Sequence, residues 1–163
     1  MEQARRATAA DLLELERLWH DARRTLGEER DGSIFLRKEA ALPSPGRNMA
    51  ELLDATDAAV FLGTLDQMAL GMAVVRRQEL GDATLLASID TLYVEPEGRA
   101  VGLGETLMTQ VLAWASSQGC QAIDSFALPG DRETKNFFET NGLKARLITV
   151  HRKLETDACL DSG

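Results

Sequence analysis

Apolar residues recur at helical spacing in two long stretches of the chain. The first stretch follows a capping-box-like start at Thr8 and stops at Gly27, and its apolar positions are Leu12, Leu15, Trp19, Ala22 and Leu26. The second stops at Gly119, and its apolar positions are Leu103, Leu107, Met108, Val111, Leu112 and Ala115. Each stretch predicts an amphipathic helix with one face in a core, and the spacing of Trp19 favours packing over ligand stacking. Two shorter helices are expected, one opening at Asn48 or Met49 and one over residues 131–140.

Runs of β-branched and aliphatic residues between these helices predict strands. In chain order, the runs cover residues 58–64, 68–77, 84–94, 122–128 and 143–154. Short polar connections join the first three runs, which favours an antiparallel meander. Residues 28–47 show no period and contain two prolines, so no regular element is expected there. Helices mixed with strands, without a dividing linker, predict one α/β domain over residues 1–154 and a polar tail at 155–163.

The charge balance narrows the class of partner. The chain has 18 lysines and arginines against 26 aspartates and glutamates, a net charge of −8 with a pI near 4.8. Nucleic acids and anionic membranes need concentrated basic surface, so this balance disfavours both. A negative field attracts cationic molecules such as amines, although many acidic proteins owe their charge to solubility alone.

Cysteine and histidine content also excludes some chemistry. Two cysteines, Cys120 and Cys159, cannot form a disulfide framework, and two histidines without a CxxC pair disfavour a metal site. The chain shows no apolar signal region at its start and no apolar run of 18 residues. We therefore expect a cytoplasmic protein that does not span a membrane.

One glycine-rich turn carries the strongest functional signal. A predicted strand ends near Val94, three glycines follow, and an amphipathic helix leaves the turn after Gly104. N–H groups at a helix start lack internal partners, so a glycine-rich approach creates an anion site. A tight turn without any ligand is the competing interpretation. A P-loop is excluded because no Gly-Lys-Ser or Gly-Lys-Thr occurs, and a dinucleotide fingerprint fits only in part, because Leu107 stands at its third glycine position.

The turn resembles the signature of the GNAT (GCN5-related) N-acetyltransferases. Residues 99–104, Arg-Ala-Val-Gly-Leu-Gly, match its Arg/Gln-x-x-Gly-x-Gly/Ala pattern, and residues 92–96 match its Leu-x-Val-x-Pro lead-in. Residues 137–143 are similar to the second motif of the family, so the resemblance covers most of the chain from residue 58 to 154. It implies the acyl-CoA N-acyltransferase fold: a mixed, mostly antiparallel sheet, helices on both faces, and splayed central strands with acetyl-CoA in the wedge.

The resemblance also implies which residues hold the cofactor. The pyrophosphate would lie on the main chain of Arg99, Ala100, Val101, Gly102, Leu103 and Gly104, together with Glu105 and Thr106 at the helix start. Main-chain groups of Leu92 and Val94 would pair with the pantetheine arm, and the Val94 N–H would polarise the thioester carbonyl. Asn136 and Phe138, from the second motif, would complete the cofactor site. No metal is implied.

Acyl transfer to an amine also needs a base and a proton for the leaving thiolate. Strand alternation predicts that Asp90 shares a face with Ser88, Leu92 and Val94, so Asp90 is the expected base and Ser88 the alternative in another register. Glu95 is a more exposed reserve, and a purely structural carboxylate is the competing role for Asp90. Many family members place a tyrosine at the position of Phe138, and the one tyrosine here, Tyr93, is expected on the opposite strand face.

The resulting prediction is an N-acetyltransferase that moves acetyl from acetyl-CoA to a primary amine by direct attack. The acceptor would be a small molecule or a protein amine, with a cationic one favoured by the charge. A non-catalytic acyl-CoA-binding or sensor module is the rival reading, because Phe138 carries no hydroxyl. A third reading, a dinucleotide-binding protein, predicts stabilisation by NAD rather than by CoA. The sheet could also be completed by a second subunit, as a homodimer.

Overall fold

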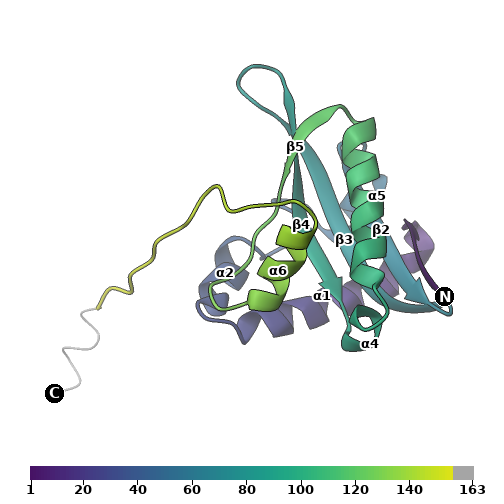
Figure 1. Ribbon diagram of the computed structural model, residues 1–163, viewed down its shortest axis with the longest axis horizontal. Coiled ribbons are helices and arrows are strands. Elements are labelled where there is room, and N and C mark those ends of the chain that lie inside the picture. Colours follow the sequence, from purple (N-terminus) through teal and green to yellow (C-terminus); the bar gives the residue numbers. More distant parts are fainter. Residues whose placement is uncertain (156–163) are drawn as a thin grey trace.

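The computed structural model describes residues 1–155 and forms one twisted sheet with helices on both faces (Figure 1). The strands are β1 (Glu2–Arg6), β2 (Ala58–Leu65), β3 (Met68–Glu79), β4 (Leu85–Val94) and β5 (Cys120–Asp124). The helices are η1 (Ala9–Asp11), α1 (Leu12–Gly27), α2 (Gly32–Lys38), α3 (Met49–Asp54), α4 (Pro96–Arg99), α5 (Leu103–Ser117) and α6 (Arg132–Thr140). Strand order follows chain order from β1 to β5, and only the β4–β5 pair is parallel.

Alternating side chains of the sheet supply two separate cores. Along β3, Val75 packs into a cluster with Leu107 and Val111 of α5, and its neighbour Val74 packs into a cluster with Leu15 of α1 and Leu52 of α3. Each of these side chains is almost entirely buried, which contributes roughly 1.5–3 kcal/mol per residue relative to exposure. The predicted amphipathic helices are therefore confirmed, and they cover opposite faces of the sheet.

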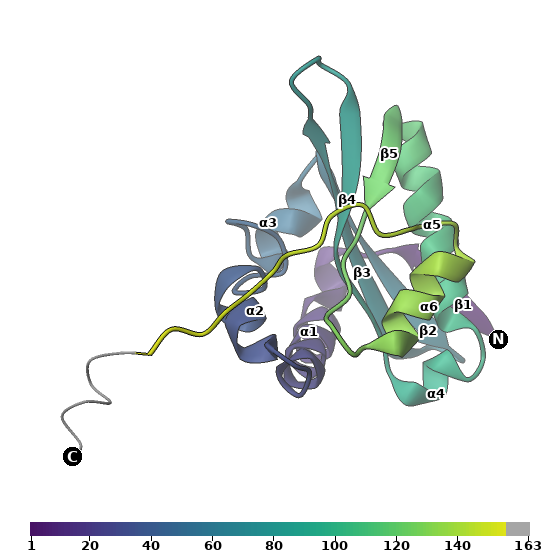
Figure 2. The ribbon, with the colours of Figure 1, turned by 60° about the vertical axis from the view of Figure 1, so that its left-hand side comes forward.

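The parallel strands β4 and β5 diverge part-way along their length. Their register runs from Leu85 opposite Cys120 to Ser88 opposite Asp124, and there the pairing stops. Strand β4 continues for six more residues while the chain leaves β5 at Ser125 (Figure 2). This confirms the predicted mixed sheet with splayed central strands.

A bulge interrupts β4 just beyond this point. Val75 of β3 is opposite Ile89 and Val74 is opposite Thr91, which leaves Asp90 as the extra residue. The bulge shifts the alternation by one residue, so Leu92 packs on the same side as Ile89. The predicted common face for Asp90, Leu92 and Val94 is therefore wrong.

Several other expectations about elements need correction. Residues 143–154 were expected as a strand, but residues 143–155 have no regular structure, because no neighbouring strand bonds to them. The strand expected over 122–128 lies at Cys120–Asp124 instead. Segment 28–47 contains α2, the turn before α5 contains α4, and β1 was not expected at all. Beyond Glu155, the predicted tail lies outside the described residues, as does Cys159.

Candidate functional site

A cavity of about 460 Å³ opens where β4 and β5 diverge. Its walls come from the end of β4, the first turn of α5, α6, the chain after β5, and one side of α1. This volume falls in the range of small-molecule and cofactor sites. The cavity has one end at α5 and α6 and a second end at α1 and segment 28–47.

The first turn of α5 presents unpaired N–H groups to the cavity. Gly102 precedes the helix with φ of +81°, a conformation that L side chains rarely adopt, and no side chain caps this helix start. Along the described chain, the N–H groups of Leu103, Gly104 and Glu105 have no acceptor, whereas the N–H of Thr106 already donates to Gly102 O. Three adjacent donors at the positive end of a 15-residue helix form an anion site.

Fewer N–H groups of this turn are free than the sequence suggested. The N–H groups of Arg99, Ala100, Val101 and Gly102 donate to carbonyls of residues 95–99, because α4 forms a helical turn there. Ala100 and Val101 are also exposed outside the cavity lining, and Leu103 is fully buried in the core. Sequence motifs locate the turn correctly but do not reveal which of its amides are already used.

The end of β4 offers a second row of main-chain groups. The Glu95 N–H donates to Leu70 O across the β3–β4 ladder at 2.8 Å. Since hydrogen-bonded and non-hydrogen-bonded pairs alternate in an antiparallel ladder, Val94 and Leu92 occupy non-hydrogen-bonded positions. Their N–H and C=O groups point away from β3, toward the side that β5 has left.

Arg99 lies against this strand end. Its Nε donates to Val94 O at 2.6 Å, and its guanidinium carbon is 6.0 Å from the centre of the Tyr93 ring. Glu133 of α6 lies 3.7 Å from the guanidinium, with both side chains more than a third exposed. Arg99 is therefore a cation held beside the free N–H groups of α5, and the Glu133 contact is screened by water.

Helix α6 closes the α5 end of the cavity. The Phe137 ring packs so closely on Gly104 that a Cβ at this glycine would lie 3.1 Å from Phe137 Cε2. Phe138 is buried in the core with only its edge on the cavity, and Asn136 is exposed at the rim. At Phe138 the cavity wall therefore has no hydroxyl, as the sequence indicated.

The second end of the cavity is built by α1 and segment 28–47. Trp19 of α1 is half-buried and lines it, so this residue serves both packing and the cavity wall. Arg23 stacks over Trp19 at 5.0 Å and donates to the main chain of residues 36 and 40, which fixes α2 over the cavity. Phe35 of α2 contacts Phe126, beyond β5, at 4.6 Å between ring centres.

Asp90 of β4 is hydrogen-bonded both to segment 28–47 and to strand β3. Its Oδ2 accepts hydrogen bonds from Ser44 Oγ at 2.7 Å and from Arg76 Nε at 2.9 Å, while Oδ1 has no partner among residues 1–155. Burial raises the pKa of Asp90, and the bonds from Ser44 and Arg76 oppose this rise. Asp90 lines the cavity, so this carboxylate of raised pKa, with Oδ1 unbonded, belongs to the cavity wall.

The other two candidate bases lie elsewhere. Ser88 is at the last β4–β5 pair, outside the cavity lining. Glu95 accepts a hydrogen bond of 2.5 Å from Arg17 and also lies outside the lining. Tyr93 packs with the α1 cluster, on the face opposite Leu92 as predicted, yet its edge reaches the cavity, and burial raises its pKa.

A scan against protein-family models decides the family. The model of the acetyltransferase (GNAT) family matches residues 14–143. The chain belongs to this family. No curated protein matches the chain.

Solved structures support the same GNAT fold. A transcriptional regulator from Bacillus halodurans C-125 superposes with a TM-score of 0.70 at 19% identity, over 94% of this chain and 100% of that one. An aminoglycoside acetyltransferase, meta-AAC0020, from an uncultured soil metagenomic sample in complex with sisomicin gives 0.66 at 19% identity, over 94% and 97%. AAC(6')-Iy in complex with the bisubstrate analog CoA-S-monomethyl-acetylneamine gives 0.65 at 19% identity, over 94% and 99%. At these identities the likeness concerns the fold.

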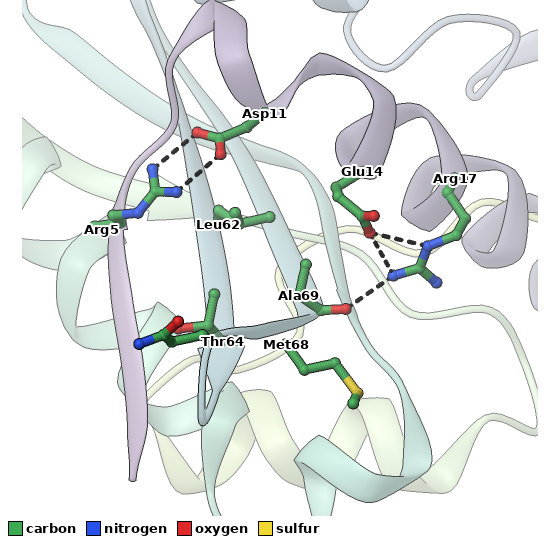
Figure 3. Close-up of a pocket in the computed structure, with 9 residues that line it drawn as sticks. Arg5, Asp11, Glu14, Arg17, Leu62, Thr64, Met68 and Ala69 are labelled. Carbon is green, nitrogen blue, oxygen red and sulfur yellow. Dashed lines mark hydrogen bonds and ion pairs between the residues drawn. The ribbon is translucent and has the colours of Figure 1, made fainter.

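A second cavity of this GNAT domain, about 370 Å³, lies between β1, the β2–β3 hairpin and the start of α1 (Figure 3). Arg5 and Asp11 form a two-bond pair there, with both distances 2.8 Å, and this pair lowers the pKa of Asp11 to about 2. Arg17 bonds to Glu14 and to Ala69 O. The charged groups that line this second cavity are thus paired with one another or with the main chain. None of the predicted site residues lines this cavity.

Residues 1–155 were also searched for metal-ligand groups and for membrane-spanning helices. No group of three or more His, Cys, Asp or Glu side chains in this range could hold a metal ion. No helix within it has the length and apolar character needed to cross a membrane.

Proposed function

We propose that this GNAT domain transfers an acetyl group from acetyl-CoA to a primary amine in a ternary complex. One observation carries the proposal: Gly104 and Glu105, whose N–H groups are free at the first turn of α5, and Val94, whose N–H points outward from β3, line the same cavity between β4 and β5. The first set suits a diphosphate, and the second suits a thioester carbonyl. These are the two polar ends of an acyl-CoA.

The described residues fit acetyl-CoA along its length. The pyrophosphate would lie on the first turn of α5, with Arg99 as the neighbouring cation. The pantetheine arm would pair with the outward main-chain groups of Leu92 and Val94 in the manner of an added strand. Asn136 would meet it at the rim, and the buried ring of Phe138 would pack on its apolar part. Supporting this fit, the space beside Gly102 is free of side chains.

The reaction would then use two groups of the chain, a donor for the carbonyl oxygen and a base. The amine nitrogen attacks the thioester carbonyl, the carbon–sulfur bond breaks, and the thiol of CoA leaves. The Val94 N–H stabilises the negative charge that develops on the carbonyl oxygen. Asp90 accepts the amine proton at Oδ1, directly or through one water, and we prefer it to Ser88 because Asp90 lines the cavity.

The leaving thiolate finds no acid at the second-motif position, and the one phenol that lines the cavity is Tyr93. Phe138 has no hydroxyl, and Tyr93 faces the α1 side of the strand. A free thiol has a pKa near 8.5, so the thiolate is a good leaving group and can take its proton from water or from the amine. The missing hydroxyl would slow the reaction without preventing it.

A cationic amine is the acceptor class that the site favours. Glu29 is half-buried at the α1 end of the cavity, and its carboxylate has no partner among the residues that the structure describes. The net charge of −8 adds a long-range attraction for cations. Aminoglycosides are the first class to test, because the similar structure meta-AAC0020 is named as an aminoglycoside acetyltransferase and is in complex with sisomicin.

The test is a panel of amines with acetyl-CoA, with free thiol as the readout. The panel includes aminoglycosides, polyamines and lysine-containing peptides, with and without the enzyme. Transfer predicts thiol release that depends on both enzyme and amine. Binding of CoA without release across the panel would instead support a non-catalytic acyl-CoA sensor, the rival favoured by the missing hydroxyl at Phe138. Stabilisation by NAD but not by CoA would contradict both readings.

A further inference from the structure

The α1 end of the large cavity has walls that are mostly aromatic and aliphatic. Three aromatic side chains from three segments line it: Trp19 of α1, Tyr93 of β4 and Phe126 beyond β5. Three smaller apolar side chains complete this wall: Ala22, Leu26 and Ala40. A ligand body with the same apolar character would displace water from this end, and such displacement favours binding.

The Phe126 ring is held against α2. Its centre lies 4.6 Å from that of Phe35, and the two ring planes are inclined by 41°, a favourable aromatic geometry. Helix α2 is fixed beside α1 (Figure 2), because a Cβ at Gly32 would overlap Leu26 O and because Arg23 donates to main-chain carbonyls of segment 28–47. The aromatic wall is therefore preformed, and a ligand can bind it without the entropic cost of ordering it.

The threonine and tyrosine hydroxyls at this end already have partners inside the protein. Thr91 Oγ1 donates to Pro43 O at 3.2 Å, and Thr25 Oγ1 donates to Asp21 O at 3.1 Å. The Tyr93 hydroxyl has Thr25 as its hydrogen-bond partner. A ligand rich in hydroxyl groups would therefore bury several of them here without a partner, and each such group weakens binding.

The groups that this end leaves open are carboxylate oxygens. Glu29 has no side-chain partner among the residues that the structure describes, and Asp90 Oδ1 is also unbonded there. Arg23, the cation of this wall, lies over Trp19 at 5.0 Å and is bonded to the main chain. An ammonium group would thus find acceptors here, beside an aromatic surface.

We propose that the acceptor is a primary amine joined by a short chain to an aromatic ring, with the ring against Phe126 and Trp19 and the nitrogen at Asp90. This inference rests on the proposed function and narrows its acceptor to one chemical class. Aminoglycosides carry many hydroxyl groups, so this wall disfavours them, although a protein of similar fold is named for that activity. Polyamines lack the ring that would cover the apolar wall.

The first experiment compares phenylpropylamine with propylamine, which share the amine arm and differ by one ring. The full chain is assayed with acetyl-CoA, with free thiol as the readout and sisomicin as a third acceptor. The proposal predicts a kcat/KM for phenylpropylamine at least about 10-fold above the values for the other two, because only its ring is buried. Equal values for phenylpropylamine and propylamine, or a higher value for sisomicin, would overturn the proposal and leave acetyl transfer itself standing.

Replacing Phe126 with Ala tests the aromatic wall. The ratio of kcat/KM for phenylpropylamine to that for propylamine should fall about fivefold, mainly through the KM of phenylpropylamine. Comparing this ratio between proteins cancels the difference in basicity of the two amines. Leu42→Ala is the matched control, because Leu42 is an apolar residue of segment 28–47 that is 40% exposed and lies outside the cavity lining. Circular dichroism checks folding; a wild-type ratio in Phe126→Ala would contradict the assigned wall.

A binding measurement separates this inference from the proposed function. The chain has two tryptophans, so Trp114→Phe leaves Trp19 as the one fluorescent reporter of its kind, on the cavity wall. With CoA present, phenylpropylamine should change the Trp19 emission at concentrations about 10-fold lower than propylamine. This binding without thiol release would refute acetyl transfer and support the aromatic site. Thiol release with other amines, and no response of Trp19 to phenylpropylamine, would refute the aromatic site and support acetyl transfer.

Discussion

Ser44 Oγ donates a hydrogen bond of 2.7 Å to Asp90 Oδ2, and this bond ties segment 28–47 to the bulge of β4. Ser44 is only 1% exposed, and next to it Thr91 Oγ1 donates to Pro43 O at 3.2 Å. The most irregular part of the sequence is therefore docked at the residue that we propose as the base. In our proposal, acceptor binding and proton transfer therefore depend on the same contact.

Replacing Asp90 with Asn tests its role as a base. The amide oxygen can still accept from Ser44, but it cannot take a proton, so turnover at pH 7 should fall about 100-fold. The optimum should move to higher pH, where more of the amine is free in solution. The measurement is kcat/KM from pH 6 to 10. Asp54→Asn, at an exposed carboxylate of α3, is the control. An unchanged pH profile would remove Asp90 from the mechanism.

Replacing Ser44 with Ala keeps the carboxylate and removes one donor. The Ser44 bond lowers the pKa of Asp90, so its loss should raise this pKa further. Since the base must be deprotonated, the acidic limb of the pH–rate profile should move to higher pH while the plateau is retained. The free energy of unfolding should drop by about 1 kcal/mol. Ser33→Ala, at an exposed serine of α2, should change neither quantity; an acidic limb that stays in place for Ser44→Ala would separate this bond from the base.

Replacing Gly104 with Glu tests the anion site. A carboxylate at the first turn of α5 repels a diphosphate and blocks its approach, so CoA should bind at least about 100-fold more weakly by calorimetry. The new side chain also crowds Phe137, which makes a modest loss of stability part of the expected result. Ala113→Glu adds the same charge on the exposed side of the same helix and should bind CoA normally. Equal affinities of the two variants would place the diphosphate elsewhere.

The Arg5–Asp11 pair makes an acid-sensitive contribution to stability. The pKa of Asp11 is about 2 in the folded protein, below its ordinary value of 3.8, so the contribution is present above pH 3.8 and is lost as pH falls through 2. Arg5 is 53% exposed, which limits the contribution to about 1 kcal/mol. Urea unfolding at pH 6 and at pH 2 should show a smaller acid loss in Arg5→Gln than in wild type. Parallel losses would mean that the pair adds nothing.

The sequence predicted elements whose pattern is local. The helical spacing of Leu103, Leu107 and Val111 identified α5, and runs of apolar residues identified β2 to β4. It missed β1, where Glu2–Arg6 has only one apolar residue and exists as a strand because β2 pairs with it. It overestimated residues 143–154, because a strand-like composition forms no strand without a neighbour.

The site, like the fold, was predictable where its residues lie close together in the sequence. The glycine turn and the two rows of main-chain donors follow from motifs that lie together in the chain. The position of Asp90 depends on a bulge, which no two-residue period reveals. Trp19 and Glu29, on α1 and just beyond it, meet Phe126 of a distant segment at the cavity, and that meeting is a product of the fold alone. Asp90 and Phe138 as functional residues stay predictions.

The most direct test follows the amide signals of the ¹⁵N-labelled protein while CoA is added. Our account predicts the largest shifts at Leu103, Gly104 and Glu105, where free N–H groups gain a diphosphate, together with Val94 on the wedge side of β4. Shifts that leave these four amides unchanged and gather on another surface would contradict the assignment of the acetyl-CoA site.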